Sequence, residues 1–216
     1  MIDCLFCRIA EGKADCEAHP ENTVLLESDA FFVKPALGHF IEGYSLVVTK
    51  EHLRTMAELE TPECVELETL LNVVSERLTT MYGSRICIFE HGAVCPTNRA
   101  GACIDHAHMH VVPTNCDVRA RLRNFQEHRI TSVSELRDFG NAGKSYIYYE
   151  HRPGDRRVFT SDDRVPSQFM RRVLCDELGM PFEWDWRLAP LFREIEQFVA
   201  RWRHDFAVEE LASSIS

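Results

Sequence analysis

Short runs of apolar and β-branched residues recur along the first half of the chain, separated by polar and glycine-containing segments. Runs of this length, bounded by turn residues, are typical of β-strands. We therefore expect a strand, a turn and a strand within 24–34, and further strands at 45–49, 85–92 and 104–112. Pro113 ends the last strand, because proline cannot donate a hydrogen bond to a neighbouring strand.

One long stretch, residues 62–81, follows helical spacing instead. Thr61 is suited to cap its start, Pro62 occupies the favoured first position, and Gly83 lies just beyond its end. The stretch predicts an amphipathic helix with one buried face. The apolar stripe on that face consists of Val65, Leu67, Leu70, Leu71, Val74 and Leu78.

The pattern changes after about residue 117, where a charged stretch leads into a hairpin signal. Two amphipathic helices are expected after the hairpin. We expect these elements at 145–150, 157–161, 167–178 and 190–206. The chain thus divides into a domain at 1–117 and an extension at 118–216, which we expect to pack on that domain.

Composition narrows the classes of protein that fit. The 216 residues include 34 acidic and 24 basic side chains, a formal charge of −10, which argues against binding duplex nucleic acid. The start of the chain lacks the pattern of a signal peptide, and no apolar run approaches the roughly 20 residues of a membrane span. We expect a soluble cytoplasmic protein without a membrane partner. The nine cysteines are odd in number and scattered, which fits a disulfide framework poorly.

Three histidines alternate along the strand expected at 104–112: His106, His108 and His110. Alternate residues of a strand share one face, so the three rings are expected on the same side. With a rise of about 3.3 Å per residue, the Cα atoms of His106 and His110 lie about 13 Å apart, too far to share one metal ion. At least one of the three therefore needs another role.

Cys4 and Cys7 have the spacing of metal ligands. Two thiolates need about two further ligands to complete a tetrahedral structural zinc site. A redox-active dithiol is the alternative. Such dithiols usually follow a strand and open a helix, and no strand precedes Cys4, which makes the redox interpretation the weaker one.

The run His106-x-His108-x-His110-Val111-Val112 resembles the signature of the histidine triad (HIT) family. Four further features match in order: Cys4-Leu5-Phe6-Cys7-Arg8-Ile9, the segment from Gly43 to His52, the helix after it, and the glycine-containing loop before the triad. The resemblance covers about residues 4–116. It implies an α+β fold, with an antiparallel sheet of about five strands and helices on one side. It also implies the symmetric homodimer that is common in the family.

The resemblance implies a role for each histidine. The middle histidine of the family motif, here His108, is the nucleophile that attacks a nucleotide α-phosphate and forms a covalent nucleotidyl-histidine. His110 then lies near the phosphate oxygens, and backbone N–H groups around Gly101 and Cys103 are further candidate donors. His91, which precedes the loop, is another candidate for the substrate site.

In zinc-bearing branches of the family, the first triad histidine joins the CxxC pair and a histidine that follows a strand. These positions correspond to Cys4, Cys7, His52 and His106. The resemblance therefore implies a closed structural zinc site that ties the N-terminus to the catalytic strand.

The function implied is a nucleotide hydrolase or nucleotidyltransferase that acts on a small nucleotide substrate. A phosphorolytic transferase and a nucleotide-binding regulator with little turnover are the alternatives, and a redox switch at Cys4 and Cys7 is a weaker one. Ala102 and Cys103 stand where many members carry Gln and Ser, and the segment Phe32–Pro35 lacks the Asp that contacts the ribose. The resemblance therefore implies a type of reaction but not which nucleotide the protein prefers.

Overall fold

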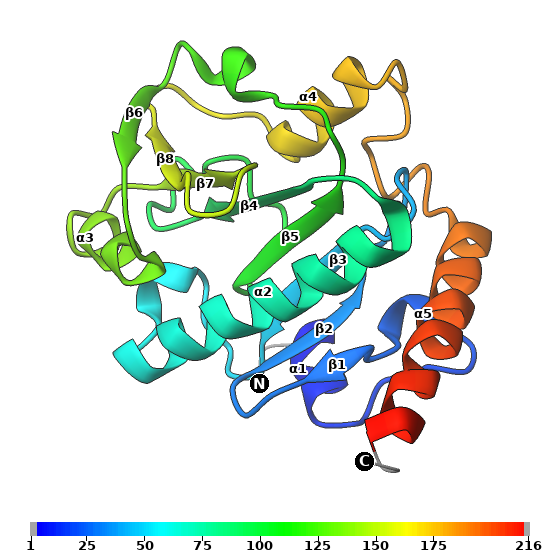
Figure 1. Cartoon of the computed structure of the whole chain (residues 1–216). Helices are drawn as coiled ribbons and strands as arrows, with labels where there is room; N and C mark the ends of the chain where they lie inside the picture. The colour runs from blue at the N-terminus through cyan, green and yellow to red at the C-terminus, as the bar shows by residue number, and fades with distance from the viewer. Residues whose placement is uncertain (1–3, 214–216) are drawn as a thin grey trace.

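A computed structural model describes residues 4–213, which form a single sheet with helices on both faces (Figure 1). The sheet has eight strands in the order β1-β2-β3-β5-β4-β7-β8-β6, and every neighbouring pair is antiparallel. The strands are β1 Leu26–Glu27, β2 Phe31–Pro35, β3 Ser45–Thr49, β4 Ile86–Gly92, β5 His108–Pro113, β6 Gln126–Arg129, β7 Tyr146–Glu150 and β8 Arg157–Thr160. The α-helices are α1 Leu5–Ala10, α2 Thr61–Tyr82, α3 Leu136–Asn141, α4 Phe169–Glu177 and α5 Phe192–Ser213. Short 3₁₀ turns cover Pro20–Asn22, Met56–Glu58, Arg119–Leu122 and Val133–Glu135.

The α+β class with an antiparallel sheet is confirmed, but the sheet has eight strands rather than about five. Strands β1 to β5 come from the first half of the chain, and the segment after residue 117 adds the other three. Strand β7 pairs along β4, from Ile88 opposite Glu150 to Gly92 opposite Tyr146. A Cβ atom at Gly92 would overlap the Tyr146 ring, so this pairing depends on glycine. The chain itself thus covers the β4 edge.

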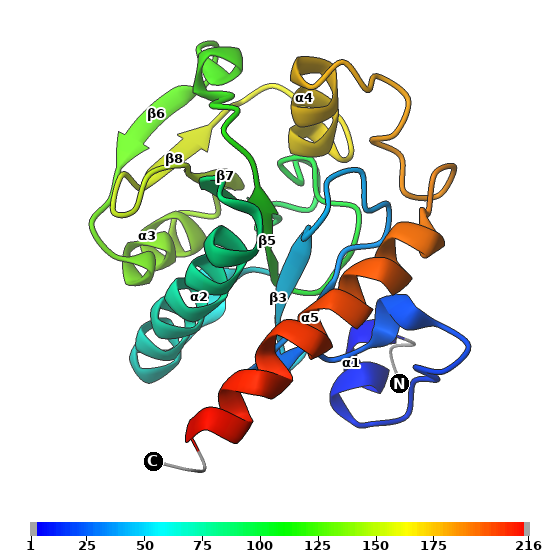
Figure 2. The same ribbon diagram turned by 45° about the vertical axis from the view of Figure 1, so that its right-hand side comes forward.

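The two faces of the sheet carry different helices (Figures 1 and 2). Helix α2 packs on one face, together with Phe198 and Trp202 of α5, against side chains such as Met109 and Val111. Helices α1 and α4 pack on the other face, against side chains such as Val48. Helix α5, coloured orange to red, runs beside β1 and β2 (Figure 1).

Helix α2 matches the predicted helix, with two corrections. The N-cap is Glu60 rather than Thr61: its side chain accepts from the N3 backbone, and the Glu63 side chain accepts from the Glu60 N–H. Val65 is 63% exposed, although the other residues of the expected stripe are buried. Gly83 ends the helix as predicted, with φ of 64°, a left-handed conformation that glycine adopts at little cost.

Strand β5 begins at His108, not at residue 104 as expected. His106 therefore precedes the strand, while His108 and His110 lie within it. The Ala107 carbonyl accepts from the N–H of Thr49, the last residue of β3. The Ala107 N–H instead donates to the Leu53 carbonyl, in the loop that follows β3. This break in the ladder allows His106 to turn toward the N-terminus.

All nine cysteines lie within the described residues and are free thiols, as the scattered spacing predicts. No helix between residues 4 and 213 combines the length and apolar character needed to span a membrane.

Candidate functional site

The three histidines lie on the sheet face that α1 and α4 cover. In the ladder, His108 is paired with Val48, and His110 lies between Leu46 on β3 and Phe89 on β4. The ring centroids of His108 and His110 are 4.9 Å apart. Phe6 of α1 places its ring edge-on to both His106 and His108, at 5.4 Å and 5.6 Å. Helix α1 therefore forms one wall of the site.

His108 has a defined tautomer. Its Nδ1 lies 2.6 Å from the backbone carbonyl oxygen of His106, which can only accept a hydrogen bond, so Nδ1 carries the proton. Burial lowers the pKa of His108 to about 4, and the ring is neutral near pH 7. The remaining nitrogen, Nε2, thus keeps a free lone pair, as a nucleophile requires.

His110 is held more tightly than His108. Its ring stacks on Phe89, with centroids 4.3 Å apart and an interplanar angle of 11°. Its Nδ1 lies 2.7 Å from the hydroxyl oxygen of Tyr44. Burial lowers the pKa of His110 well below its usual value, so this ring is also neutral.

His91, on β4, joins the same cluster, with its ring centroid 5.9 Å from that of His110. The Met170 N–H donates to Nε2 of His91 over 3.2 Å. Burial lowers the pKa of His91 to about 3. The structure thus places His91 beside the triad, where the sequence suggested it as a candidate.

The loop before β5 contacts the C-terminal half of the chain. The Gly101 carbonyl accepts a hydrogen bond from the Gln168 N–H over 2.7 Å. A Cβ atom at Gly101 would lie 3.0 Å from both the His91 ring and the Pro166 carbonyl, so the loop approaches the site closely. Cys103 is half-buried in this loop, and within residues 4–213 no hydrogen bond joins its thiol to the triad. The structure therefore brings Gly101 close to the His91 ring, whereas Cys103 makes no hydrogen bond to the triad within the described part of the chain.

The four predicted zinc ligands converge at the N-terminal end of β5. Their ligand atoms, from Cys4, Cys7, His52 and His106, all lie within 4.8 Å of one another. Nδ1 of His106 lies 3.4 Å from Sγ of Cys4, and Nδ1 of His52 lies 3.2 Å from Sγ of Cys7. A tetrahedral zinc with Zn–S of about 2.3 Å and Zn–N of about 2.0 Å holds sulfur and nitrogen about 3.5 Å apart. The observed separations are close to that value.

The other nitrogen of His106 supports the same geometry. Its Nε2 lies 2.8 Å from the Thr49 carbonyl oxygen and therefore carries the proton. Nδ1 is left with a lone pair that points toward the cysteines. A metal-ligating histidine usually donates its second N–H to a carbonyl or carboxylate in this way. The donor set thus fits a zinc ion.

Three buried polar residues near the triad were not singled out by sequence reasoning as site residues: Lys34, Tyr44 and Arg171. Lys34 lies in register with Leu46 and, through it, with His110, and burial lowers the pKa of its ammonium to about 8. Arg171 is only 3% exposed, although it belongs to the C-terminal segment. The periodicity of the sequence does not mark these positions, because Tyr44 directly precedes β3, Lys34 lies within β2 and Arg171 lies in an amphipathic helix.

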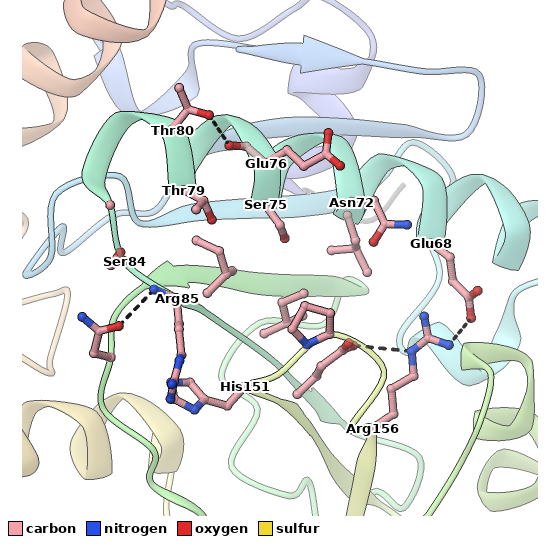
Figure 3. A pocket seen from close by; sticks show the side chains of 17 residues that line it. Glu68, Asn72, Ser75, Glu76, Thr79, Thr80, Ser84, Arg85, His151 and Arg156 are labelled. Atoms are coloured by element: carbon pink, nitrogen blue, oxygen red, sulfur yellow. Dashed lines mark hydrogen bonds and ion pairs between the residues drawn. The ribbon is translucent and has the colours of Figure 1, made fainter.

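A cavity of about 900 Å³ lies away from the histidines (Figure 3). Polar side chains of α2 line it, including Asn72 and Ser75, and His151 and Arg156 face them. It also contacts Ile88, which packs in the core on the α2 side of the sheet. A smaller cavity of about 400 Å³ lies beside Gly101, between the loop before β5 and the segment before α4.

No protein-family model and no curated protein matches the sequence. The solved structures to which the chain is similar include a HIT family protein from Bacillus anthracis str. 'Ames Ancestor', with 16% identity and a TM-score of 0.44, covering 54% of this chain and 76% of that one. A hypothetical histidine triad nucleotide-binding protein from Sulfolobus tokodaii strain7 has 23% identity and a TM-score of 0.41, covering 53% and 71%. A HIT family hydrolase from Clostridium thermocellum has 19% identity and a TM-score of 0.41, covering 52% and 91%. Over about half of its length, this chain is similar to proteins of the HIT family.

Proposed function

We propose that the protein is a nucleotide hydrolase or nucleotidyltransferase in which His108 attacks a nucleotide α-phosphate. The observation that carries this proposal is the hydrogen bond from Nδ1 of His108 to the His106 carbonyl. It leaves Nε2 unprotonated, as a nucleophile requires. The His110 ring lies beside it, with the two ring centroids 4.9 Å apart, so both rings can contact the same phosphate. His108 is the nucleophile, and His110 contacts the phosphate oxygens.

The reaction has two displacements at phosphorus. In the first, the Nε2 lone pair of His108 forms a bond to the α-phosphorus, and the bond from phosphorus to the leaving group breaks, with its electron pair going to the leaving group. In the second, a water oxygen attacks phosphorus and loses its proton to solvent, while the N–P bond breaks and its electrons return to Nε2. The products are the leaving group and a nucleoside monophosphate. Donors such as His110 stabilise the charge on the phosphate oxygens in both steps.

We further propose that Cys4, Cys7, His52 and His106 hold a structural zinc ion. Four protein ligands leave no open position, so the ion's contribution is to join the N-terminal segment to the strand that carries His108. Phe6 lies between Cys4 and Cys7 and contacts the His108 ring. The metal site therefore also positions a wall of the substrate site.

The segment at 118–216 is, in this proposal, part of the same folding unit. Its strand β7 pairs with β4 from Ile88 to Gly92. Gln168, directly before α4, contacts Gly101 in the loop before β5. Because β7 covers the β4 edge, that edge is not available to a strand of a second copy in the expected homodimer.

The proposal is tested by single-turnover labelling. The full chain is mixed with nucleotides labelled at the α-phosphate: a dinucleoside polyphosphate, a nucleotide sugar and an AMP phosphoramidate. We expect acid-labile label on the protein, none on His108→Ala, and undiminished label on His128→Ala, a half-buried histidine that pairs with Thr160 on the far part of the sheet. Nucleotide binding without any protein-bound label would favour the regulator, and label released only by inorganic phosphate would favour the phosphorolytic transferase.

A further inference from the structure

Helix α4, which belongs to the C-terminal segment, reaches the histidine cluster with both its backbone and a buried charge. The Gln168 N–H, just before the helix, donates to the Gly101 carbonyl, and the Met170 N–H donates to His91. Arg171 follows directly. These two hydrogen bonds join the start of α4 directly to the histidine cluster and to the loop before β5.

Arg171 is fixed in place by two backbone carbonyls. Its Nε donates to the Trp184 carbonyl and one terminal nitrogen donates to the Gly38 carbonyl, each over 2.8 Å. The guanidinium carbon lies 5.0 Å from the Phe40 ring centroid and 5.2 Å from that of Tyr44. A Cβ atom at Gly38 would overlap the guanidinium, so this loop closely follows the arginine. Two hydrogen bonds and two aromatic rings thus hold the guanidinium over the Tyr44 ring.

Tyr44 connects this cation to the triad. It is 0% exposed, and its hydroxyl lies 2.7 Å from Nδ1 of His110. Burial raises the pKa of Tyr44 against the smaller opposing effect of Arg171, so the phenol keeps its proton. His110 is neutral and has one N–H. Either the phenol donates to Nδ1 and the ring proton lies on Nε2, or the ring donates from Nδ1.

The charge of Arg171 selects between these two arrangements. Arg171 acts on the Tyr44 hydroxyl by its charge and by a side-chain hydrogen bond, the two effects that oppose the rise in the pKa of Tyr44. The hydroxyl oxygen therefore faces the guanidinium with a lone pair, and its O–H bond points away from the cation. The hydroxyl then donates to Nδ1 of His110, and the ring proton lies on Nε2. In a buried site this preference is stronger than in water, because the effective dielectric constant is lower.

The second contact acts on His91 in the same way. Met170 lies in the first turn of α4, where backbone N–H groups have no partner within the helix. Its N–H can only donate, so Nε2 of His91 is the acceptor and the ring proton lies on Nδ1.

We propose that α4 sets the tautomers of the histidine cluster, with Arg171 and Tyr44 as positioning residues that keep His110 protonated at Nε2, and with the Met170 amide keeping His91 protonated at Nδ1. The catalytic consequence rests on the proposed function: Nε2–H of His110 is then the donor that faces the phosphate when His108 attacks. The C-terminal segment is thus part of the reactive site and not only a cover for the β4 edge.

The tautomers are measured directly by ¹⁵N NMR of the imidazole groups in the full-length protein, with His110 and His91 assigned by the loss of their signals in His110→Gln and His91→Gln. We expect His110 to be protonated at Nε2 and His91 at Nδ1. Tyr44→Phe should shift His110 toward the Nδ1–H form and leave His91 unchanged. The control is Tyr148→Phe, which removes an equally buried phenol whose hydroxyl donates to Glu150 on the α2 side of the sheet. A wild-type His110 with its proton on Nδ1, or a tautomer unchanged by Tyr44→Phe, would overturn the proposal.

Arg171 is tested by Arg171→Met and by the conservative Arg171→Lys, with Arg172→Met as the control for loss of a neighbouring guanidinium that stacks on Trp184. Loss of one preorganised donor lowers kcat by about 10²–10³. Arg171→Met, which only weakens the preference, should lower kcat about tenfold at nearly constant KM and shift the His110 signals, and Arg171→Lys should restore part of both. If Arg171→Met fails to fold, the lysine variant and Tyr44→Phe still decide the question. A chain that turns over no nucleotide but shows the tautomer shift refutes the proposed function alone, whereas normal turnover with unchanged tautomers refutes the role of α4 alone.

Discussion

Removing one ligand of the Cys4, Cys7, His52 and His106 cluster should cost the protein its zinc and part of its stability. In Cys4→Ser, a hydroxyl replaces the thiol that lies 3.4 Å from Nδ1 of His106. Three ligands remain, and a neutral hydroxyl is a far weaker zinc ligand than a thiolate. We expect zinc content to fall from about one per chain to a small fraction of that value.

The loss of stability follows from linkage between binding and folding. A ligand present at about 100 times its dissociation constant stabilises the native state by about 2.7 kcal/mol. For a chain of this length, about 1 kcal/mol shifts the melting temperature by about 2–4 °C. Cys4→Ser should therefore melt about 5–10 °C lower than the zinc-loaded wild type, and a chelator should lower the wild type to the same value.

The assay is metal analysis of protein purified without added metal, together with thermal unfolding with and without chelator. The matched control is Cys16→Ser, an exposed thiol outside the cluster, which should keep both its zinc and its melting temperature. The reasoning is refuted if the wild type contains a Cys4–Cys7 disulfide and no metal, or if both serine variants lose equal stability.

Three other outcomes are expected. His108→Ala should abolish turnover and the protein-bound nucleotide while keeping zinc, whereas His110→Ala should be about 10²–10³ slower and still form the adduct in single-turnover labelling; near wild-type turnover of His108→Ala would contradict the triad mechanism. Truncation after residue 117 removes β7 and leaves one edge of β4 unpaired, so the fragment should aggregate or melt without cooperativity in calorimetry. A sharply melting soluble fragment would show two independent domains. Burial raises the pKa of Glu90 from 4.5 to about 7. Between pH 4.5 and pH 7, the carboxyl group is therefore protonated in the native state and ionised in the unfolded chain. The stability from this proton is complete below about pH 4.5 and is lost as the pH rises through about 7, by up to about 3 kcal/mol, and urea unfolding at pH 5 and pH 8 should show a smaller difference for Glu90→Gln than for the wild type.

The periodicity of the sequence determined most elements in the first half of the chain. The apolar stripe from Leu67 to Leu78 can be buried on one side only as a helix, and it packs as α2 on the sheet. The short apolar runs around Val33, Val47 and Ile88 are strands in the structure. Local rules were sufficient here because each element buries its own apolar face. They failed at single positions, such as the cap at Glu60, where two side chains and two backbone groups bond reciprocally.

The resemblance to the histidine triad family also predicted which cysteines and histidines meet. A CxxC pair, a histidine after a strand and a histidine before the triad strand converge in the structure as the resemblance implies. The prediction that His106 lies within the strand was wrong, because the ladder of β5 begins only at His108. The chemistry of the ligands, rather than the strand geometry, made the metal site predictable.

Only the tertiary structure decided how the C-terminal segment joins the rest. Strand β6 lies in a charged stretch with no apolar alternation, because it is an edge strand whose side chains are mostly exposed. The pairing of β7 with β4, and the approach of Arg171 to Tyr44, join residues that are more than fifty positions apart in sequence. Such contacts leave no local pattern, since a buried arginine on an amphipathic helix has the same sequence context as an exposed one. The sequence by itself therefore indicated the candidate histidines, and only the fold decided which distant residues contact them.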